Sequence, residues 1–300
     1  MIRLEFMNKN ETIRNKVVEE YYNELIKGRT KVAILDKWCD NNLNMKLLFG
    51  SKNDKDSNSF KKIVTANLSS LLKVRDFICK NNIKMSEELK KYMTGTMYES
   101  IDRIKFVNTL GVKVCPYCNR NYINSSKNKT HCQFDHFINK NKYPILATSF
   151  YNLVPVCPSC NHIKSDDDFS YSPYDDTVHT DEIITFSYLI KGINYLNDAS
   201  KIEIVLKNTA KLDLNVEKLK LKDLYQIHSD IVQELIKKRE IYTDDYVEQL
   251  SNRFKGLFNS KHEIERLILG AYTIEEDYGK RPLSKMITDI SKELMLIKEK

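Results

Sequence analysis

The sequence has little glycine and little proline, and it has no long hydrophobic run. Only 8 of its 300 residues are Gly and 6 are Pro, which excludes a loop-dominated or low-complexity chain. The uncharged apolar-rich run at residues 183–190 is far too short to span a bilayer, which takes about 20 residues. Residues 1–6 lack the extended apolar region of a secretory signal. We therefore expect a soluble, cytoplasmic protein.

Basic residues outnumber acidic ones. The chain has 48 Lys and Arg against 41 Asp and Glu, a net charge of +7 at pH 7. This mild excess favours a polyanionic partner but does not establish one, because many basic proteins bind no nucleic acid. Hydrophobic residues make up 41% and charged residues 30%, which is typical of a globular protein, and the length suits one large domain or two to three small ones.

The spacing of apolar residues divides the chain into three parts. Residues 1–110 repeat at helical spacing and predict an N-terminal helical region. Residues 111–175 break this pattern with aromatic, β-branched and turn-forming residues, and residues 176–300 combine a small β-hairpin with further helices. The expected fold class is α+β and mostly α-helical, with a small central module between helical flanks.

Within these parts the pattern predicts individual elements. A third N-terminal helix is expected over residues 86–108. Residues 119–123 and 130–134 predict two short strands joined by a polar turn, while alternation at 184–190 and 202–206 predicts an antiparallel hairpin.

The seven cysteines include two pairs with the same spacing. The odd total and the repeated Cys-Pro-x-Cys turn argue for metal ligands in a reducing compartment rather than for disulfides. Four thiolates suit a tetrahedral Zn²⁺, and a fully ligated ion would have a structural role. The predicted zinc ligands are Cys115, Cys118, Cys157 and Cys160, with 38 residues between the two pairs. The remaining cysteines, Cys39, Cys79 and Cys132, are expected to be small apolar core residues.

An Asp-His pair lies between the two cysteine pairs, and two asparagines follow it. Asp135 offers a hard oxygen ligand for Mg²⁺, and His136 offers a base with a pKa near the working pH. Asn152 has the means to orient His136, and Asn161 offers a second oxygen ligand directly after Cys160. Hydrolysis of a phosphodiester needs such a base, a divalent ion and a group that orients the base.

This arrangement resembles the HNH (ββα-metal) endonucleases, in particular the subclass with a four-cysteine zinc knuckle. The matching residues are Cys115, Cys118, Asp135-His136, Asn152-Leu153, Cys157, Cys160-Asn161 and Lys164. The resemblance implies that Asp135 and Asn161 hold a catalytic Mg²⁺ or Mn²⁺, that His136 is the general base, and that Asn152 orients it. It also implies cleavage that leaves a 5′-phosphate and a 3′-hydroxyl.

The chain departs from the family pattern at two places. Asn139 stands where many members have Pro, and the following loop lacks their Gly-rich turn. Asn161 stands at a position that is often His, which leaves the adjacent His162 as a competing ligand.

A longer stretch, residues 133–155, is similar to HNH effectors of bacterial anti-phage systems, namely the HNH subunit of Septu-type and related retron systems. That resemblance implies an antiviral role beside a partner ATPase. The helical flanks exceed what a bare nuclease needs, which suggests a surface for a partner or for self-association.

Residues 111–165 contain seven Lys or Arg and one acidic residue, Asp135. Such a segment suits a phosphate backbone, and Arg120 and Lys164 are the expected phosphate contacts because they adjoin the motif. DNA is the expected substrate. Two alternatives remain open, an RNA-cleaving nuclease and a zinc-stapled module that binds nucleic acid or a partner without catalysis.

Overall fold

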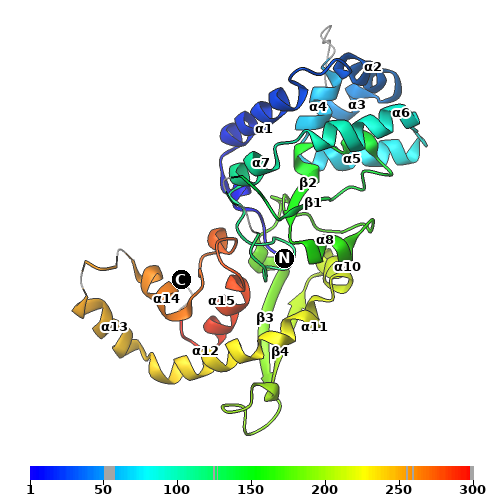
Figure 1. Ribbon diagram of the computed structural model, residues 1–300. Coiled ribbons are helices and arrows are strands. Elements are labelled where there is room, and N and C mark those ends of the chain that lie inside the picture. Colours follow the sequence, from blue (N-terminus) through cyan, green and yellow to red (C-terminus); the bar gives the residue numbers. More distant parts are fainter. Residues whose placement is uncertain (51–57, 124–125, 127, 255, 259, 298–300) are drawn as a thin grey trace.

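The computed structural model describes residues 1–50, 58–123, 126, 128–254, 256–258 and 260–297. It is mostly helical and contains two small antiparallel strand pairs. In Figure 1 the N-terminal helices form the upper part, and β1 (Gln133–His136), β2 (Leu153–Val156) and α8 (Pro158–Lys164) lie in the middle. No helix of the described residues is long and apolar enough to cross a membrane.

The upper part is built from short helices whose starts are set by polar caps. The side chains of Asn10, Asn44 and Asn67 each accept a hydrogen bond from a backbone N–H of the first turn, which satisfies a donor that the helix itself leaves unpaired. These helices are α1 (Glu11–Ile26), α2 (Val32–Asn42), α3 (Met45–Phe49), α4 (Ser59–Thr65), α5 (Leu68–Lys80), α6 (Glu87–Lys91) and α7 (Arg103–Leu110).

The single helix predicted over residues 86–108 is wrong, because the chain breaks inside that range. After α6 a π-helical turn covers Tyr92–Met97, and α7 starts only at Arg103. Asp102 caps α7 by accepting a hydrogen bond from the backbone N–H of Lys105 at 2.9 Å. Asp favours such a cap over a helix interior. The break puts Tyr98 and Arg103 on either side of a bend.

The predicted pairing of residues 119–123 with residues 130–134 is also wrong. β1 pairs antiparallel with the distant β2, so that Asp135 lies opposite Val154 and His136 opposite Leu153. Residues 119–123 contribute one isolated bridge, between Val114 and Tyr122. Part of the polar turn that was expected to join the two segments lies outside the described residues.

The hairpin predicted in the third part is confirmed. β3 (Ile184–Ile190) and β4 (Ile202–Asn208) pair antiparallel, and α15 (Ser284–Glu293) packs on β3. The side chains of Ile184 and Phe186 are buried, whereas Ile190 at the far end is exposed. The helices around this hairpin are α9 (Thr180–Ile183), α10 (Asp213–Lys218), α11 (Leu221–Tyr225), α12 (Ser229–Ile241), α13 (Asp244–Arg253), α14 (Lys261–Leu269) and α15 (Ser284–Glu293).

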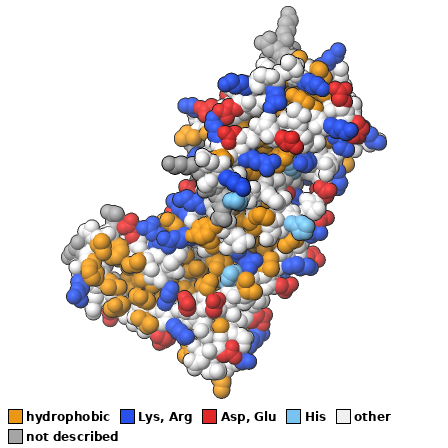
Figure 2. All heavy atoms as spheres, viewed as in Figure 1, with side chains coloured by type: hydrophobic (Ala, Val, Ile, Leu, Met, Phe, Trp, Pro, Cys, Tyr) orange, Lys and Arg blue, Asp and Glu red, His pale blue; other side chains and the backbone are white. Residues whose placement is uncertain are grey.

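An arm formed by α12, α13 and α14 extends away from the hairpin (Figure 1). Figure 2 shows apolar side chains gathered over this arm. The exposed apolar residues there are Ile241, Tyr246, Phe254, Leu257 and Leu267.

Both flanks are hydrogen-bonded to the middle of the molecule. The N-terminal part contributes bonds from the backbone N–H of Ile2 to Pro116 O at 2.9 Å, from Tyr21 Oη to Thr148 O at 2.9 Å, and from Ser149 Oγ to Ile63 O at 3.0 Å. The C-terminal part contributes bonds from Tyr225 Oη to Cys118 O and from the N–H of Leu283 to Asn119 O, both 2.6 Å long. The middle segment, residues 111–175, is therefore held from both sides.

Candidate functional site

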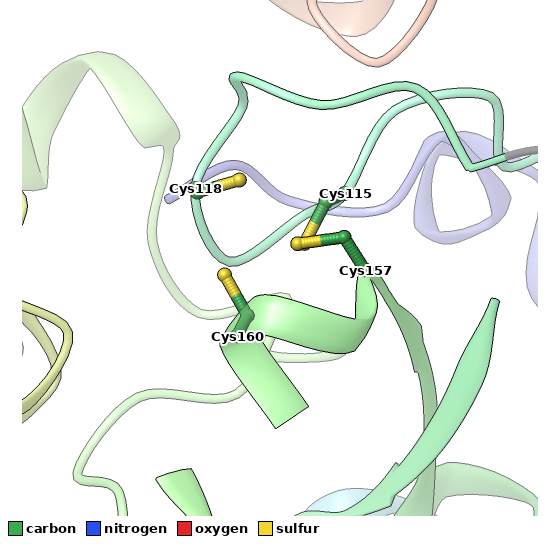
Figure 3. A group of neighbouring side chains, drawn as sticks. All are labelled: Cys115, Cys118, Cys157 and Cys160. Carbon is green, nitrogen blue, oxygen red and sulfur yellow. The ribbon is translucent and has the colours of Figure 1, made fainter. Parts of the chain in front are cut away.

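Four cysteine side chains converge where the middle segment begins and where β2 meets α8. Their Sγ atoms all lie within 4.8 Å of one another, and all four residues are buried. Figure 3 shows Cys115 and Cys118 on a loop, facing Cys157 and Cys160 at the start of α8. Among the residues that the structure describes, this is the one group of three or more Cys, His, Asp or Glu side chains close enough to bind a metal ion.

The local backbone explains how each pair of cysteines is presented. Asn119 adopts a positive φ of 50° after Cys118, and its N–H bonds back to Cys115 O at 2.8 Å, which closes the first turn. Asn and Gly tolerate this left-handed region best. Cys157 caps α8, and Pro158 occupies the first turn of the helix, where its missing N–H costs nothing.

The four thiols fit a zinc ion. A tetrahedral Zn²⁺ with Zn–S bonds of about 2.3 Å separates its sulfurs by about 3.8 Å, and the observed cluster needs only small adjustments to reach that size. Hydrogen bonds from Cys115 lower the pKa of Cys118 and of Cys157, while a hydrogen bond with Cys115 raises the pKa of Cys160. Crowded thiols therefore compete for protons, and a bound cation would hold all four as thiolates. The N–H of Arg120 and the amide of Asn121 each donate to a sulfur at 3.4 Å.

His136 is buried on one face of β1, with 8% of its surface exposed. Its Nε2 lies 2.9 Å from Ala147 O, and a carbonyl oxygen only accepts, so Nε2 carries the ring proton. Burial, reinforced by the charge of Lys140, lowers the pKa of His136 to about 3. The ring is therefore neutral near pH 7, and Nδ1 keeps an unprotonated lone pair.

Asp135 points to the opposite face of β1, toward α8. It is 3% exposed. Lys164 Nζ donates to its Oδ1 at 3.0 Å, and Tyr117 Oη donates to its Oδ2 at 2.6 Å. Burial raises the pKa of Asp135, and the charge of Lys164 and the Tyr117 hydrogen bond oppose that effect.

Asn152 is fully buried and fixes the backbone around His136. Its Oδ1 accepts from the N–H of Ile138 at 2.6 Å, and its Nδ2 donates to Ile138 O and to Leu146 O at 3.0 and 2.9 Å. One amide therefore ties the residues just after His136 to the residue just before Ala147, whose carbonyl binds the imidazole.

Residues 115–167 match the family model of the HNH endonuclease. This HNH segment spans the four cysteines, both strands of the first pair and α8. No curated protein and no solved structure matches the chain.

Within the HNH segment, the two asparagines and His162 occupy distinct places. Asn161 lies on the side of α8 that faces β1, where its Nδ2 donates to Gln133 Oε1 at 2.7 Å. Gln133 and Asp135 share a face because strand side chains alternate. His162 is exposed. Asn152 acts on backbone groups rather than on the ring of His136.

The two residues expected to contact phosphate are both engaged elsewhere. Lys164 is 1% exposed and donates to Asp135 and to His136 O, so it lies beneath the surface in this structure. Arg120 Nε donates to His228 Nε2 at 3.0 Å, and its guanidinium lies over Tyr225. This arrangement ties the four-cysteine cluster to the C-terminal part.

Three contributors to the site carried no signal in the sequence. Ala147 acts through a backbone carbonyl, which its residue type does not reveal. Tyr117 lies inside the first Cys-Pro-x-Cys turn, and nothing in that motif indicates that its hydroxyl bonds to Asp135. Tyr98, whose ring centroid lies 4.8 Å from that of His136, comes from the helical region before the HNH segment.

Proposed function

We propose that this protein is a metal-dependent HNH endonuclease that hydrolyses phosphodiester bonds of nucleic acid, with His136 as general base. The observation that carries the proposal is the state of His136: a neutral ring held through Nε2 by Ala147 O, with Nδ1 left as a proton acceptor. A base must be held in one tautomer to take a proton from water efficiently.

In this mechanism Nδ1 of His136 takes the proton of the attacking water. The Ala147 carbonyl keeps the ring oriented and stabilises the imidazolium that forms. Asn152 holds both backbone segments that set this geometry. An anionic phosphate bound near Lys140 would raise the pKa of His136 toward the working pH, because the charge of Lys140 is among the causes that lower it.

Asp135 and Asn161 are the proposed ligands of a catalytic Mg²⁺ or Mn²⁺. An ionised carboxylate has about four acceptor positions, and Lys164 and Tyr117 use two of those on Asp135. Asn161 bonds Gln133 through its Nδ2, so its carbonyl oxygen is the atom offered to a hard cation. Asn161 faces β1 and His162 is exposed, which favours Asn161 as the ligand. The ion would stabilise negative charge on the phosphate and the leaving oxygen, and it would compete with the ammonium of Lys164.

DNA rather than RNA is the proposed substrate, and anti-phage defence is the proposed role. The support is the similarity of residues 133–155 to HNH effectors of Septu-type and retron systems, which work beside an ATPase. The exposed apolar residues of α12–α14 offer a surface for such a partner. The assignment would be supported if an ATPase co-purifies with the wild-type chain but not with the double variant Leu257→Asp, Leu267→Asp. Co-purification unchanged by those substitutions would contradict it.

The test of the function is cleavage of supercoiled plasmid by the zinc-loaded protein with Mg²⁺ or Mn²⁺. We expect metal-dependent nicking that His136→Ala abolishes, by a factor of about 10² or more. His131→Ala is the matched control, because His131 is exposed, and it should keep full activity. A His136→Ala variant as active as wild type would reject the base. Binding of DNA without cleavage would favour the binding-module alternative, and a parallel assay on single-stranded RNA would reveal an RNA-directed enzyme.

A further inference from the structure

Two cations lie over a single aromatic ring beside His136. Lys140 Nζ is 4.4 Å from the centroid of the Tyr98 ring, and the guanidinium carbon of Arg103 is 5.3 Å from it. The same ring packs on His136 with a centroid distance of 4.8 Å. Arg103 also lies 5.8 Å from the ring of Phe134, one of the β1 residues on the His136 face. The two positive charges therefore lie on the face of β1 that carries the proposed base.

Neither cation has a carboxylate partner at ion-pair distance within the part of the chain that the structure describes. Asp166 and Glu99 act on Lys140 only from farther away, whereas burial and the charge of Arg103 lower the pKa of Lys140. Lys105, two residues beyond Arg103 on α7, differs in that it forms an ion pair with Glu24. Arg103 and Lys140 are thus two partly buried like charges that repel each other, and neither has a described carboxylate at ion-pair distance.

Contact with an aromatic ring accounts for where the two cations lie but not for why both are there. The attraction of a cation to an aromatic ring is modest at an exposed site, and a second cation at the same ring adds repulsion. An anion placed between them would neutralise that repulsion. A guanidinium presents a planar fork that matches phosphate oxygens, and an ammonium supplies a compact second charge.

We propose that Arg103 and Lys140 form a phosphate-binding cradle that holds a backbone phosphate of the DNA strand beside His136. The proposal rests on the proposed function of His136. It assigns part of the substrate site to the helical region, because Tyr98 and Arg103 precede the HNH segment at residues 115–167. Tyr98, whose ring contacts both cations and the imidazole ring, would form the floor of the cradle.

The test is DNA binding by zinc-loaded full-length protein with no Mg²⁺ or Mn²⁺ added. Fluorescence anisotropy of a labelled duplex over a salt series gives both the affinity and the salt slope. We expect Arg103→Gln with Lys140→Gln to weaken binding about tenfold or more. The double variant should also reduce the slope of log K against log salt by about one for each phosphate that the protein no longer neutralises. Gln keeps a polar side chain of similar length over the Tyr98 ring, and Arg103→Lys, which keeps the charge, should retain most of the slope.

The matched control is Arg75→Gln with Lys105→Gln. It removes the same charge from two residues that are already paired, with Asp76 and Glu24, and it should leave the slope nearly unchanged. Zinc content and the melting temperature are checked for every variant. If a cradle variant fails to fold, Lys140→Gln alone carries the test, because Lys140 is only partly buried and lies in a loop.

The possible outcomes test the proposed phosphate-binding cradle and the proposed nuclease activity separately. Plasmid cleavage by wild type, with slopes equal in the cradle and control variants, would overturn the cradle and leave the nuclease standing. A reduced slope in the cradle variants without cleavage by wild type would support the cradle and count against the nuclease. A wild-type chain that neither binds nor cleaves DNA would overturn both.

Discussion

Lys164 and Asp135 form a buried ion pair at the point where the proposed catalytic ion would bind. Side-chain exposure is 1% for Lys164 and 4% for Asp135, so bulk water does little to screen the pair. Lys164 also donates to His136 O at 3.1 Å. One ammonium thus links the proposed metal ligand to the backbone of the proposed base, and it occupies one acceptor position of Asp135.

Replacing Lys164 by Met should make divalent ions more stabilising. Without added metal we expect Lys164→Met to lose roughly 3 kcal/mol of unfolding free energy, because a buried carboxylate loses its partner. Since no ammonium competes, added Mg²⁺ should raise the melting temperature of the variant more than that of wild type. Differential scanning fluorimetry measures both effects. Lys218→Met is the control, because Lys218 pairs with Asp167 in an exposed position. An equal response to Mg²⁺ in wild type and Lys164→Met would contradict the assignment of Asp135 as a ligand.

His136 should also give stability a characteristic dependence on pH. Its pKa in the folded chain, about 3, lies below the 6.5 of an unperturbed histidine. Between these values the unfolded chain binds a proton that the folded chain does not. The contribution of His136 is therefore complete above pH 6.5 and is lost as pH falls toward 3, by about 1.4 kcal/mol per pH unit.

The measurement is urea unfolding at several pH values for wild type and His136→Gln, with zinc content checked at each. The stability difference between the two should shrink as pH falls, which isolates His136 from Asp135, whose raised pKa acts in the opposite direction. The unfolding free energy of His131→Gln should change with pH in the same way as that of wild type. A difference that stays constant with pH would show that His136 is not held neutral by the fold.

At the scale of elements, the four-cysteine cluster joins the two ends of the HNH segment. Cys115 and Cys118 precede β1, whereas Cys157 and Cys160 follow β2 directly. A metal ion bound there would hold together both ends of a connection that β1 and β2 alone, with four residues each, close only weakly.

Cys157→Ser should therefore lose zinc and destabilise the middle of the molecule. Structural zinc contributes directly to folding free energy, so the unfolding free energy should fall by several kcal/mol. Zinc content by atomic absorption and a thermal melt report the two effects. Cys79→Ser is the control, because Cys79 is exposed, so the expectation that it is a core residue is wrong. An unchanged zinc content and melt for Cys157→Ser would rule out the knuckle as a zinc site.

The elements that sequence predicted well are those with local or repeated signals. The paired Cys-Pro-x-Cys turns and the alternation in β3 and β4 indicated their structures directly. β2 was missed because it lies far along the chain from β1 and contains Pro155, which argues against a strand in a single-sequence analysis. The sequence did not indicate the break within residues 86–108, because Asp102 suits both the surface of a helix and its N-cap.

The residues of the site were predicted unevenly for a related physical reason. Asp135, His136 and Asn152 carry their chemistry in the side chain, and the structure brings all three to the same strand pair and its connection. Ala147 contributes only a carbonyl, and Lys164 is a lysine whose burial depends on tertiary packing. Arg103 and Tyr98 reach the site from a part of the chain where the pattern indicated only a helical scaffold.

At the scale of the whole molecule, residues 111–175 do not stand apart from their flanks. Backbone and side-chain hydrogen bonds reach them from Ile2, Tyr21 and Ile63 on one side, and from Tyr225 and Leu283 on the other. We therefore propose that the three regions inferred from sequence fold together rather than as independent units.

A fragment of residues 111–175 should therefore fail to fold on its own, even with zinc. We expect it to lack a cooperative unfolding transition by circular dichroism, while the full chain unfolds with one. The physical reason is that many buried apolar side chains of the segment pack on helices outside it, and a segment of this size has little core of its own. A zinc-loaded fragment with a sharp transition would show instead that it is an autonomous domain.

The position of the knuckle has a consequence for how inhibition by chelators is interpreted. The proposed catalytic ion, held by one carboxylate and one amide oxygen, should exchange with solvent quickly, whereas an ion enclosed by four buried thiolates should leave slowly. Treatment with EDTA should then abolish cleavage in two kinetic phases. The early loss should be reversed by adding Mg²⁺ alone, and the late loss should need zinc and refolding, so the time course of inactivation would distinguish the ion that takes part in the reaction from the ion that holds the chain together.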